Sequence, residues 1–194
     1  MKKYYFYLLI SSLFLFSCQA SSPFRIGNQY GAKVSYGNGR HPGIDYEIGR
    51  GTPIIAASYG EVVYVGDADC PKKIHCGGFF VEIRHGDHFN TFYGHLQQAF
   101  VKKGQILKRG ELIGISGASN SGYIHLHFSV CTIGGKCDFH ETYNPKNFWL
   151  DSQAQCYDFK KDYSDYSQKD ITLPIACGKY SEILQNQINK LQEQ

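Results

Sequence analysis

Two histidines separated by one residue are the first feature of this sequence that could do chemistry. His125 and His127 lie in a run of β-branched and aromatic residues at positions 124–130. Residues two apart on a strand point to the same face, so both imidazoles can converge while Leu126 and Phe128 turn toward the core. Such a pair can place a metal ligand beside a catalytic base, although two half-buried histidines would give the same pattern.

A second pair combines a histidine and a carboxylate. His41 and Asp45 are separated by Pro42-Gly43, which favours a turn running into a strand. A tight turn can bring both side chains to one ion. With His127 they would make the two-histidine, one-carboxylate set of open catalytic zinc sites, which keep a water in the remaining position. The alternative is a turn in which Asp45 only hydrogen-bonds backbone groups.

A further histidine, His95, follows the aromatic run 91–94 and is expected at the end of a strand. A lone histidine in such a place is more often structural or exposed than catalytic. The same interpretation applies to the four remaining histidines, which are His75, His85, His88 and His140.

Taken in order, these elements resemble the motifs of the lysostaphin-type (LytM-like) zinc endopeptidases, which act on peptidoglycan. That family shows a His-x-x-x-Asp motif, then a lone histidine after an aromatic strand, then a His-x-His. The connecting sequence is similar too, as in Gly51-Thr52-Pro53-Ile54, Gly60-Glu61-Val62-Val63, Ser116-Gly117 and Asn144-Pro145. The resemblance covers about residues 25–150.

The resemblance implies one zinc ion (Zn2+) per chain, with His41, Asp45 and His127 as ligands. It implies that His95 and His125 are the two non-ligand histidines that line the site and assist catalysis. Either could move a proton or donate a hydrogen bond to the oxyanion, and their division of roles stays open. The implied fold is a compact antiparallel β-sheet domain with the zinc at the floor of a groove.

The implied reaction is endopeptidase hydrolysis of peptidoglycan stem peptides or cross-bridges. One alternative is a degenerate family member that binds or activates other wall hydrolases without cutting. Another is a zinc carboxypeptidase that trims stem peptides, for which Arg40 or Arg50 could hold a terminal carboxylate. The zincin motif H-E-x-x-H is absent from the sequence, so we expect no glutamate base of that type.

The elements that must position these residues read as strands. Between residues 25 and 150, short β-branched or aromatic runs are punctuated by glycine-rich turns, and no stretch there has a sustained helical period. The runs occupy residues 61–65, 79–84, 91–94, 111–116 and 124–130. Strands that follow one another closely in the sequence, without intervening helices, predict an all-β, antiparallel domain over residues 25–150.

The chain changes character in the C-terminal extension, residues 151–194. Residues 157–170 are polar and predict a loop. Leu184, Ile188 and Leu191 recur at helical spacing within 181–194, which predicts a short helix. The helix could pack on the domain or bind a partner, and the sequence alone does not decide between them.

The N-terminus predicts export. Lys2 and Lys3 precede an apolar run at 4–16, which is too short to span about 30 Å of hydrocarbon but fits a secretory signal. The run ends in Leu15-Phe16-Ser17-Cys18, which resembles a bacterial lipobox. We therefore expect residues 1–17 to be a lipoprotein signal peptide, Cys18 to carry the lipid, and 18–24 to form a short tether. The protein would be anchored in the envelope, on the outer membrane facing the periplasm if the source is Gram-negative; a plain signal peptide is the alternative.

Six cysteines remain after Cys18, an even number that suits a disulfide-forming compartment. Neighbouring positions suggest three pairs, although six cysteines allow 15 connectivities. The suggested pairs are Cys70 with Cys76, Cys131 with Cys137, and Cys156 with Cys177. The alternative for the first pair is a structural zinc site of Cys70, His75 and Cys76, whose spacing is unusual for such sites.

The net charge and its distribution bear only on a nucleic-acid partner. The formal net charge is +3, and the basic residues form no concentrated stripe of the kind that nucleic-acid binders carry. We expect no nucleic-acid partner, and a regulatory protein partner stays open.

Overall fold

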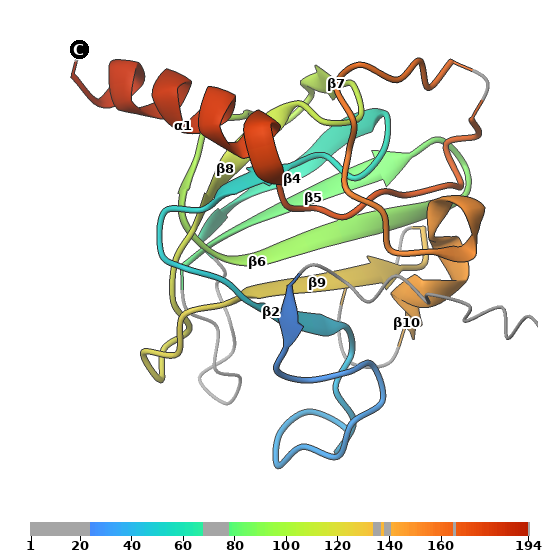
Figure 1. Cartoon of the computed structure of the whole chain (residues 1–194). Helices are drawn as coiled ribbons and strands as arrows, with labels where there is room; N and C mark the ends of the chain where they lie inside the picture. The colour runs from blue at the N-terminus through green and yellow to red at the C-terminus, as the bar shows by residue number, and fades with distance from the viewer. Residues whose placement is uncertain (1–23, 68–77, 134–136, 138–140, 165, 194) are drawn as a thin grey trace, which may run out of the picture.

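A computed structural model of the chain describes residues 24–67, 78–133, 137, 141–164 and 166–193. Its sheet is antiparallel, with the strand order β1-β2-β9-β6-β5-β4-β7; β10 adds to β9, and β8 pairs with β3 and β6 (Figure 1). The strands are β1 (Arg25–Ile26), β2 (Ile44–Glu47), β3 (Pro53–Ile55), β4 (Gly60–Asp67), β5 (Phe79–His85), β6 (Phe89–Ala99), β7 (Ile106–Leu107), β8 (Leu112–Ser116), β9 (Leu126–Cys131) and β10 (Thr142–Tyr143). Two 3₁₀ turns, η1 (Pro145–Phe148) and η2 (Leu150–Ser152), precede the C-terminal helix α1 (Gly178–Gln192). The all-β prediction with one C-terminal helix is confirmed.

The central strands have one face in the core and one face toward the candidate site. In the pairing of β2 with β9, Ile44 lies opposite Phe128 and Asp45 lies opposite His127. Because side chains alternate along a strand, the first pair and the second pair point to opposite faces of the sheet. Ile44 and Phe128 are almost fully buried, as is Leu126, so the predicted core-facing residues of β9 are confirmed.

The core face is covered by the C-terminal extension. Ile171, Leu173 and Ile175 are fully buried and belong to the same apolar cluster as the central strands. Figure 1 shows the orange-to-red chain crossing the sheet before it enters α1. Backbone hydrogen bonds fix this crossing, including the one from Ile55 N to Pro174 O at 3.0 Å. The extension therefore completes the core of the domain.

Helix α1 begins three residues before the predicted start at 181 and packs on the domain. Leu184 and Ile188 are buried, whereas Leu191 is 55% exposed. Leu184 shares a small apolar cluster with Ile55 and Ala176. Packing on the domain is the alternative that the structure supports for this helix.

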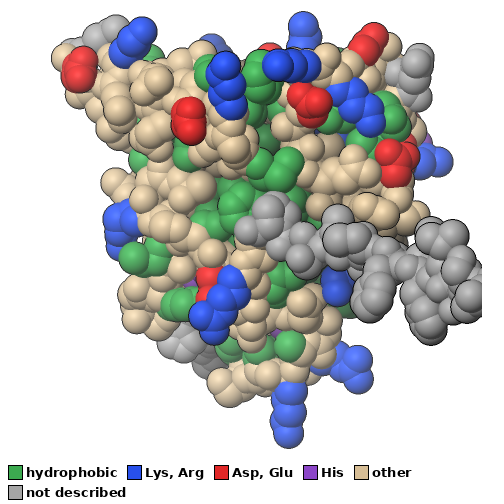
Figure 2. All heavy atoms as spheres, viewed as in Figure 1, with side chains coloured by type: hydrophobic (Ala, Val, Ile, Leu, Met, Phe, Trp, Pro, Cys, Tyr) green, Lys and Arg blue, Asp and Glu red, His purple; other side chains and the backbone are tan. Residues whose placement is uncertain are grey.

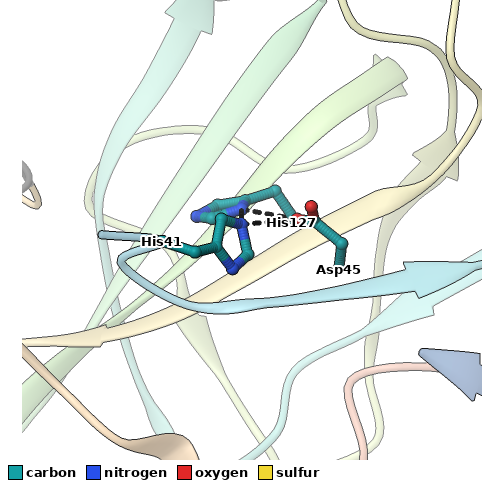
Figure 3. Close-up of side chains that lie close together, drawn as sticks. All are labelled: His41, Asp45 and His127. Atoms are coloured by element: carbon teal, nitrogen blue, oxygen red, sulfur yellow. Dashed lines mark hydrogen bonds and ion pairs between the residues drawn. The ribbon is translucent and has the colours of Figure 1, made fainter. Parts of the chain in front are cut away.

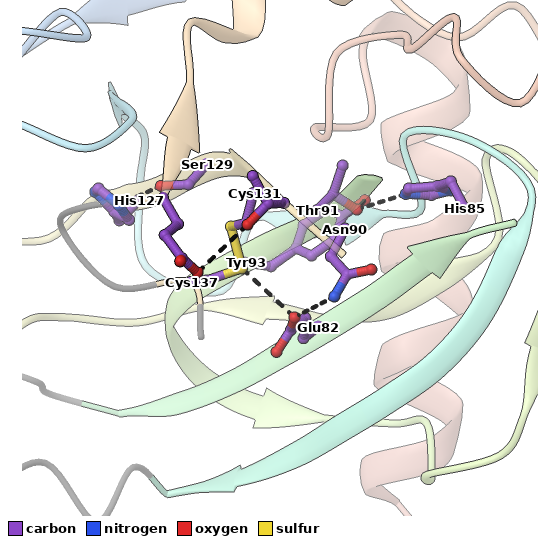
Figure 4. Close-up of a disulfide and its surroundings, with 11 residues drawn as sticks. Glu82, His85, Asn90, Thr91, Tyr93, His127, Ser129, Cys131 and Cys137 are labelled. Carbon is purple, nitrogen blue, oxygen red and sulfur yellow. Dashed lines mark hydrogen bonds between the residues drawn. A yellow bond between two sulfur atoms is a disulfide. The ribbon is translucent and has the colours of Figure 1, made fainter. Parts of the chain in front are cut away.

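Two of the three suggested disulfides are present. Cys131, the last residue of β9, is bonded to Cys137 (Figure 4), and Cys156 is bonded to Cys177 at the start of α1. Cys18, the pair Cys70–Cys76 and the alternative zinc reading with His75 lie outside the described residues, as does His140.

Two strand boundaries differ from the prediction. Strand β6 was expected to end at Gly94-His95, but it runs from Phe89 to Ala99. It continues because it exchanges one neighbour for another: residues up to Gly94 pair with β9, and those from Leu96 pair with β8. Strand β9 was expected to begin at Ile124 but begins at Leu126, because Ile124 bridges to Ala118 in the preceding loop and not to β2.

Charged side chains are dispersed among uncharged ones on the face seen in Figure 2. That face therefore has no large region of a single sign that would steer a charged partner. In the part of the chain that the structure describes, no helix is long and apolar enough to cross a membrane.

One histidine is a core residue. His85 is fully buried at the end of β5, with Nδ1 2.7 Å from the Tyr59 carbonyl oxygen and Nε2 2.7 Å from the Thr91 hydroxyl (Figure 4). The carbonyl can only accept, so the Nδ1 proton donates to it and Nε2 accepts from Thr91. Burial lowers the pKa of His85 to about 4, because the imidazolium would lose its hydration. The structural interpretation of His85 agrees with these contacts.

This depressed pKa predicts a loss of stability in acid. The unfolded chain takes up a proton on His85 near pH 6.5, but the folded chain does so only near pH 4. The contribution of neutral His85 to the free energy of unfolding is therefore fully present above pH 6.5 and decreases as the pH falls from 6.5 to 4. The loss attributable to His85 should reach about 3 kcal/mol at pH 4. His85→Asn keeps a donor for Tyr59 but cannot be protonated, so its unfolding free energy from denaturant titrations should depend less on pH. His88→Asn, at an exposed position, is the control and should keep the full pH dependence.

Candidate metal centre

Three side chains converge where β2 meets β9. Asp45 and His127 face each other across the two strands. His41 reaches them from the turn before β2, where His41 N donates to Ala32 O and His41 O accepts from Gly31 N, both at 2.8 Å. Gly43 permits this approach, because a Cβ there would lie 2.3 Å from the Phe128 carbonyl oxygen. The predicted turn running into a strand is therefore what the structure shows.

The three side chains present one atom each to a common point (Figure 3). Asp45 Oδ1 lies 3.0 Å from His41 Nε2 and 2.8 Å from His127 Nδ1, and the two nitrogens are 3.2 Å apart. His41 and Asp45 are almost fully buried, while the side chain of His127 is 13% exposed. Of the three side chains, His127 is therefore the one that is partly accessible to solvent.

The remaining polar atoms of these side chains have other partners. His41 Nδ1 lies 3.2 Å from the Gln29 carbonyl oxygen, and His127 Nε2 lies 2.8 Å from the Ser129 hydroxyl (Figure 4). Asn28 Nδ2 donates to Asp45 Oδ2 at 2.9 Å. Outer partners of this kind fix the ring orientation and tautomer of metal-binding histidines.

These contacts allow a test of whether a cation fits. The Gln29 carbonyl can only accept, so it takes the Nδ1 proton of His41 and leaves Nε2 of the neutral ring as a bare lone pair. That lone pair faces a carboxylate oxygen and a second ring nitrogen, and only a proton or a cation between them makes the contacts attractive. Donors of a tetrahedral zinc site lie about 3.3 Å apart, given zinc–ligand bonds of about 2.0 Å. The separations of 2.8–3.2 Å are close to that value, so the donor set fits zinc.

The electrostatics of Asp45 point the same way. Burial raises the pKa of its carboxyl, but the contacts with the His127 and His41 imidazoles outweigh burial and hold the pKa well below its usual range. Asp45 is therefore ionised and supplies the negative charge that a divalent cation needs.

His125 stands beside this group. It lies one residue before β9 and is 5% exposed, with Nε2 3.6 Å from Asp45 Oδ1. Its Nδ1 lies 3.0 Å from the Tyr123 carbonyl oxygen, which accepts the Nδ1 proton. Burial lowers the pKa of His125, so the ring is neutral near pH 7 and Nε2 faces the site as an acceptor.

His95 lies against His125, with ring centroids 4.5 Å apart. It sits inside β6, where the strand exchanges β9 for β8, and its backbone has φ 63°. A non-glycine residue in this left-handed region is uncommon, costs of order 1 kcal/mol and is often found at functional sites. The irregularity turns the His95 side chain toward His125 and not along the regular strand face.

All five predicted site residues thus lie together, and Arg40, Arg50 and His88 are exposed. The sequence reasoning missed the partners that orient them. Ser129 could have been found, because it is two residues after His127 and shares its strand face. Asn28 and Gln29 lie in a turn that the sequence does not connect with Asp45 or His41.

Comparison with known proteins gives concordant results. The profile described as Peptidase family M23 matches residues 39–139, just over half of the chain. The catalytic domain of the antimicrobial peptidase lysostaphin from Staphylococcus simulans superimposes with a TM-score of 0.57 and 28% identity, covering 64% of this chain and 91% of that one.

Two curated relatives are similar over the same region. Peptidoglycan DD-endopeptidase ShyA of Vibrio cholerae is 36% identical over 97 residues, which are 48% of this chain and 21% of ShyA. The uncharacterized lipoprotein YgeR of Escherichia coli is 35% identical over 96 residues, which are 50% of this chain and 36% of YgeR. The chain therefore spans only about a fifth to a third of these relatives.

The outer partner of His127 provides a test of the metal centre. We expect His127→Ala to lose stoichiometric zinc, because one of three donors is gone. Ser129→Ala keeps all three donors but frees the imidazole, so zinc affinity should fall by about 10- to 100-fold. Ser121→Ala, at an exposed serine before β9, is the control and should bind zinc like the wild type. Titration against a chromogenic chelator measures each affinity, and equal affinities for all four proteins would contradict the assignment.

Proposed function

The chain belongs to peptidase family M23, and on this premise we propose that it is a zinc endopeptidase that hydrolyses the peptide cross-links of bacterial peptidoglycan. The observation that carries the proposal is the convergence of His41 Nε2, Asp45 Oδ1 and His127 Nδ1 on one point. The substrate class is supported by the relative named as a peptidoglycan DD-endopeptidase.

His41, Asp45 and His127 would hold the zinc. When bound, zinc supplies Lewis-acid chemistry: it polarises the scissile carbonyl and lowers the pKa of water toward about 7. Two neutral imidazoles and one carboxylate leave the loaded site with a net positive charge, which favours negative charge developing on the substrate. Asn28 keeps the second oxygen of Asp45 engaged, so the carboxylate offers Oδ1 alone.

We assign proton transfer to His125. Its Nδ1 proton is held by the Tyr123 carbonyl, so Nε2 is the atom that can accept a proton from the attacking water. The same nitrogen can return that proton to the amine nitrogen as the peptide C–N bond breaks. His95, whose ring packs on His125, is the second histidine that can exchange a proton or donate a hydrogen bond to the substrate.

A non-cleaving family member would be expected to have lost at least one of the five positions. Here all five are present, and the hydrogen-bond partners of the His41, His125 and His127 rings are consistent with an intact site. This argument favours the enzyme over a protein that only binds or activates other wall hydrolases.

Cleavage of a purified cross-linked muropeptide dimer tests the proposal. The zinc-loaded wild type should release two monomers, and chelation should stop the reaction until zinc is restored. His125→Ala should keep about one zinc per chain while turnover falls by roughly 10²- to 10⁴-fold, the range for a lost acid–base group. His88→Ala, at an exposed position, is the control. Mass spectrometry of the products decides: an uncut dimer contradicts the enzyme proposal, and loss of one terminal residue would indicate a carboxypeptidase.

We also propose that the protein works from a lipid anchor in the envelope. The lipobox-like sequence ending at Cys18 supports this placement, as does the lipoprotein name of the Escherichia coli relative. Cys18→Ala should release the protein from the membrane fraction or leave it unprocessed, because the lipid attachment point is gone. Fractionation and immunoblotting measure this, and unchanged membrane attachment would contradict the anchor.

A further inference from the structure

Tyr123 forms the outer member of a row of three rings at the site. Its ring centroid lies 4.6 Å from that of His125, with the planes inclined by 31°, and His95 lies 4.5 Å away on the His125 ring. His125 is therefore packed against both a histidine and a tyrosine. Tyr123 is 42% exposed, so its contact with His125 is not explained by burial in the core.

The backbone of Tyr123 also acts on His125. Its carbonyl oxygen accepts from His125 Nδ1 at 3.0 Å and from Ser119 N at 3.0 Å. The second bond closes the loop between β8 and β9, where Ala118 bridges to Ile124. The position of the Tyr123 carbonyl, and with it the tautomer of His125, thus depends on where this loop sits.

The side chain of Tyr123 ties that loop to another part of the sheet. Its hydroxyl donates to Glu47 Oε1 at 2.6 Å, and Glu47 Oε2 lies 2.9 Å from Arg25 Nε on the neighbouring strand β1. Partial burial and the bond to Glu47 raise the pKa of Tyr123 to about 12, so the hydroxyl keeps its proton and is the donor. Gly27 leaves room for this bond, since a Cβ there would lie 2.8 Å from the Tyr123 hydroxyl.

The strand that receives this hydrogen bond is the one that carries Asp45. Asp45 and Glu47 are two residues apart on β2 and share one face of the strand. The bond from Tyr123 to Glu47 therefore connects the loop bearing His125 directly to the strand that supplies the carboxylate ligand. No part of this connection involves the three proposed zinc ligands.

We propose that Tyr123 is a positioning residue that holds His125 in the orientation and tautomer needed for proton transfer, with Glu47 as its anchor. The proposal rests on the proposed function. The ring of Tyr123 limits rotation of the imidazole, its carbonyl fixes the proton on Nδ1, and its hydroxyl fixes the loop. Tyr123 acts through His125 and takes no part in the bond changes.

Two kinds of variant separate the ring from the hydroxyl. Tyr123→Ala removes both, and kcat on the muropeptide dimer should fall by about 10- to 100-fold, since small misplacement of a catalytic group is that costly. KM should stay within about twofold and zinc near one per chain. Tyr123→Phe keeps the ring and should recover part of the lost activity, with a kcat about 3- to 10-fold above that of Tyr123→Ala. Tyr143→Ala, at an equally exposed tyrosine (44%) on β10, is the matched control and should behave like the wild type.

A double-mutant cycle tests the anchor. Tyr123→Phe and Glu47→Ala remove opposite ends of one hydrogen bond, so the double variant should be no slower than the slower single variant. Glu47→Gln keeps an acceptor for the hydroxyl and should retain more activity than Glu47→Ala. Additive losses would show that Glu47 and Tyr123 act separately and would overturn the anchor.

A spectroscopic measurement keeps this test independent of turnover. Long-range ¹H–¹⁵N spectra of the zinc-loaded wild type should show His125 protonated at Nδ1 and bare at Nε2, with the signals assigned by their loss in His125→Ala. Tyr123→Ala should show both tautomers, and Tyr123→Phe should stay closer to the wild type. If the loaded wild type cuts nothing, the proposed function fails while these spectra still decide the role of Tyr123.

Three outcomes would overturn the inference. An unchanged kcat and tautomer in Tyr123→Ala would show that His125 needs no such support. A raised KM with unchanged kcat would make Tyr123 a substrate contact. Loss of zinc in both Tyr123→Ala and Tyr123→Phe would make it a structural support of the ligands instead.

Discussion

The register between β2 and β9 is the constraint on which the site depends. It places Asp45 opposite His127, and His41 reaches the same point from the turn that leads into β2. A slip of one residue would turn Asp45 into the core and Ile44 or Tyr46 toward the site, because the side-chain period of a strand is two. The register is therefore enforced by burial: Ile44 and Tyr46 are each only 1% exposed.

Burial of apolar side chains on the opposite face of the sheet stabilises this register between β2 and β9. Ile171, Leu173 and Ile175 come from the C-terminal extension and are fully buried against the central strands. Burying side chains of this size stabilises by about 1.5–3 kcal/mol each, before the entropy of ordering the chain is subtracted. The Cys156–Cys177 disulfide closes the loop that carries them. The extension thus contributes to the site from a distance, by fixing which face of β2 and β9 is buried.

The site was more predictable from the sequence than the structure around it. The spacing of His125 and His127 predicted that both side chains share one face, because alternation along an extended chain is a local property. The turn at Pro42-Gly43 suggested that His41 and Asp45 could reach one ion together with His127, and only the resemblance to a known family added His95 to them. The full length of β6 was missed, because a strand that changes partners carries no signal of the change. The role of residues 171–175 in the core was also missed, since a short apolar segment after a polar loop does not reveal what it covers.

His127 and His95 are oriented in different ways, one by regular strand pairing and the other by an irregular point in a strand. His127 lies in regular β9 opposite Asp45, and the pairing of two strands fixes that separation. His95 lies where β6 leaves β9, with φ 63° and its carbonyl accepting from Gly117 N at 2.8 Å. In a regular strand, the side chain of residue 95 would point to one face of the sheet and those of residues 94 and 96 to the other. The change of partners frees it from that constraint, so its side chain can lie on the His125 ring. Strand register thus positions two of the three proposed metal donors, Asp45 and His127. His95 and His125 lie instead where regular pairing changes or stops.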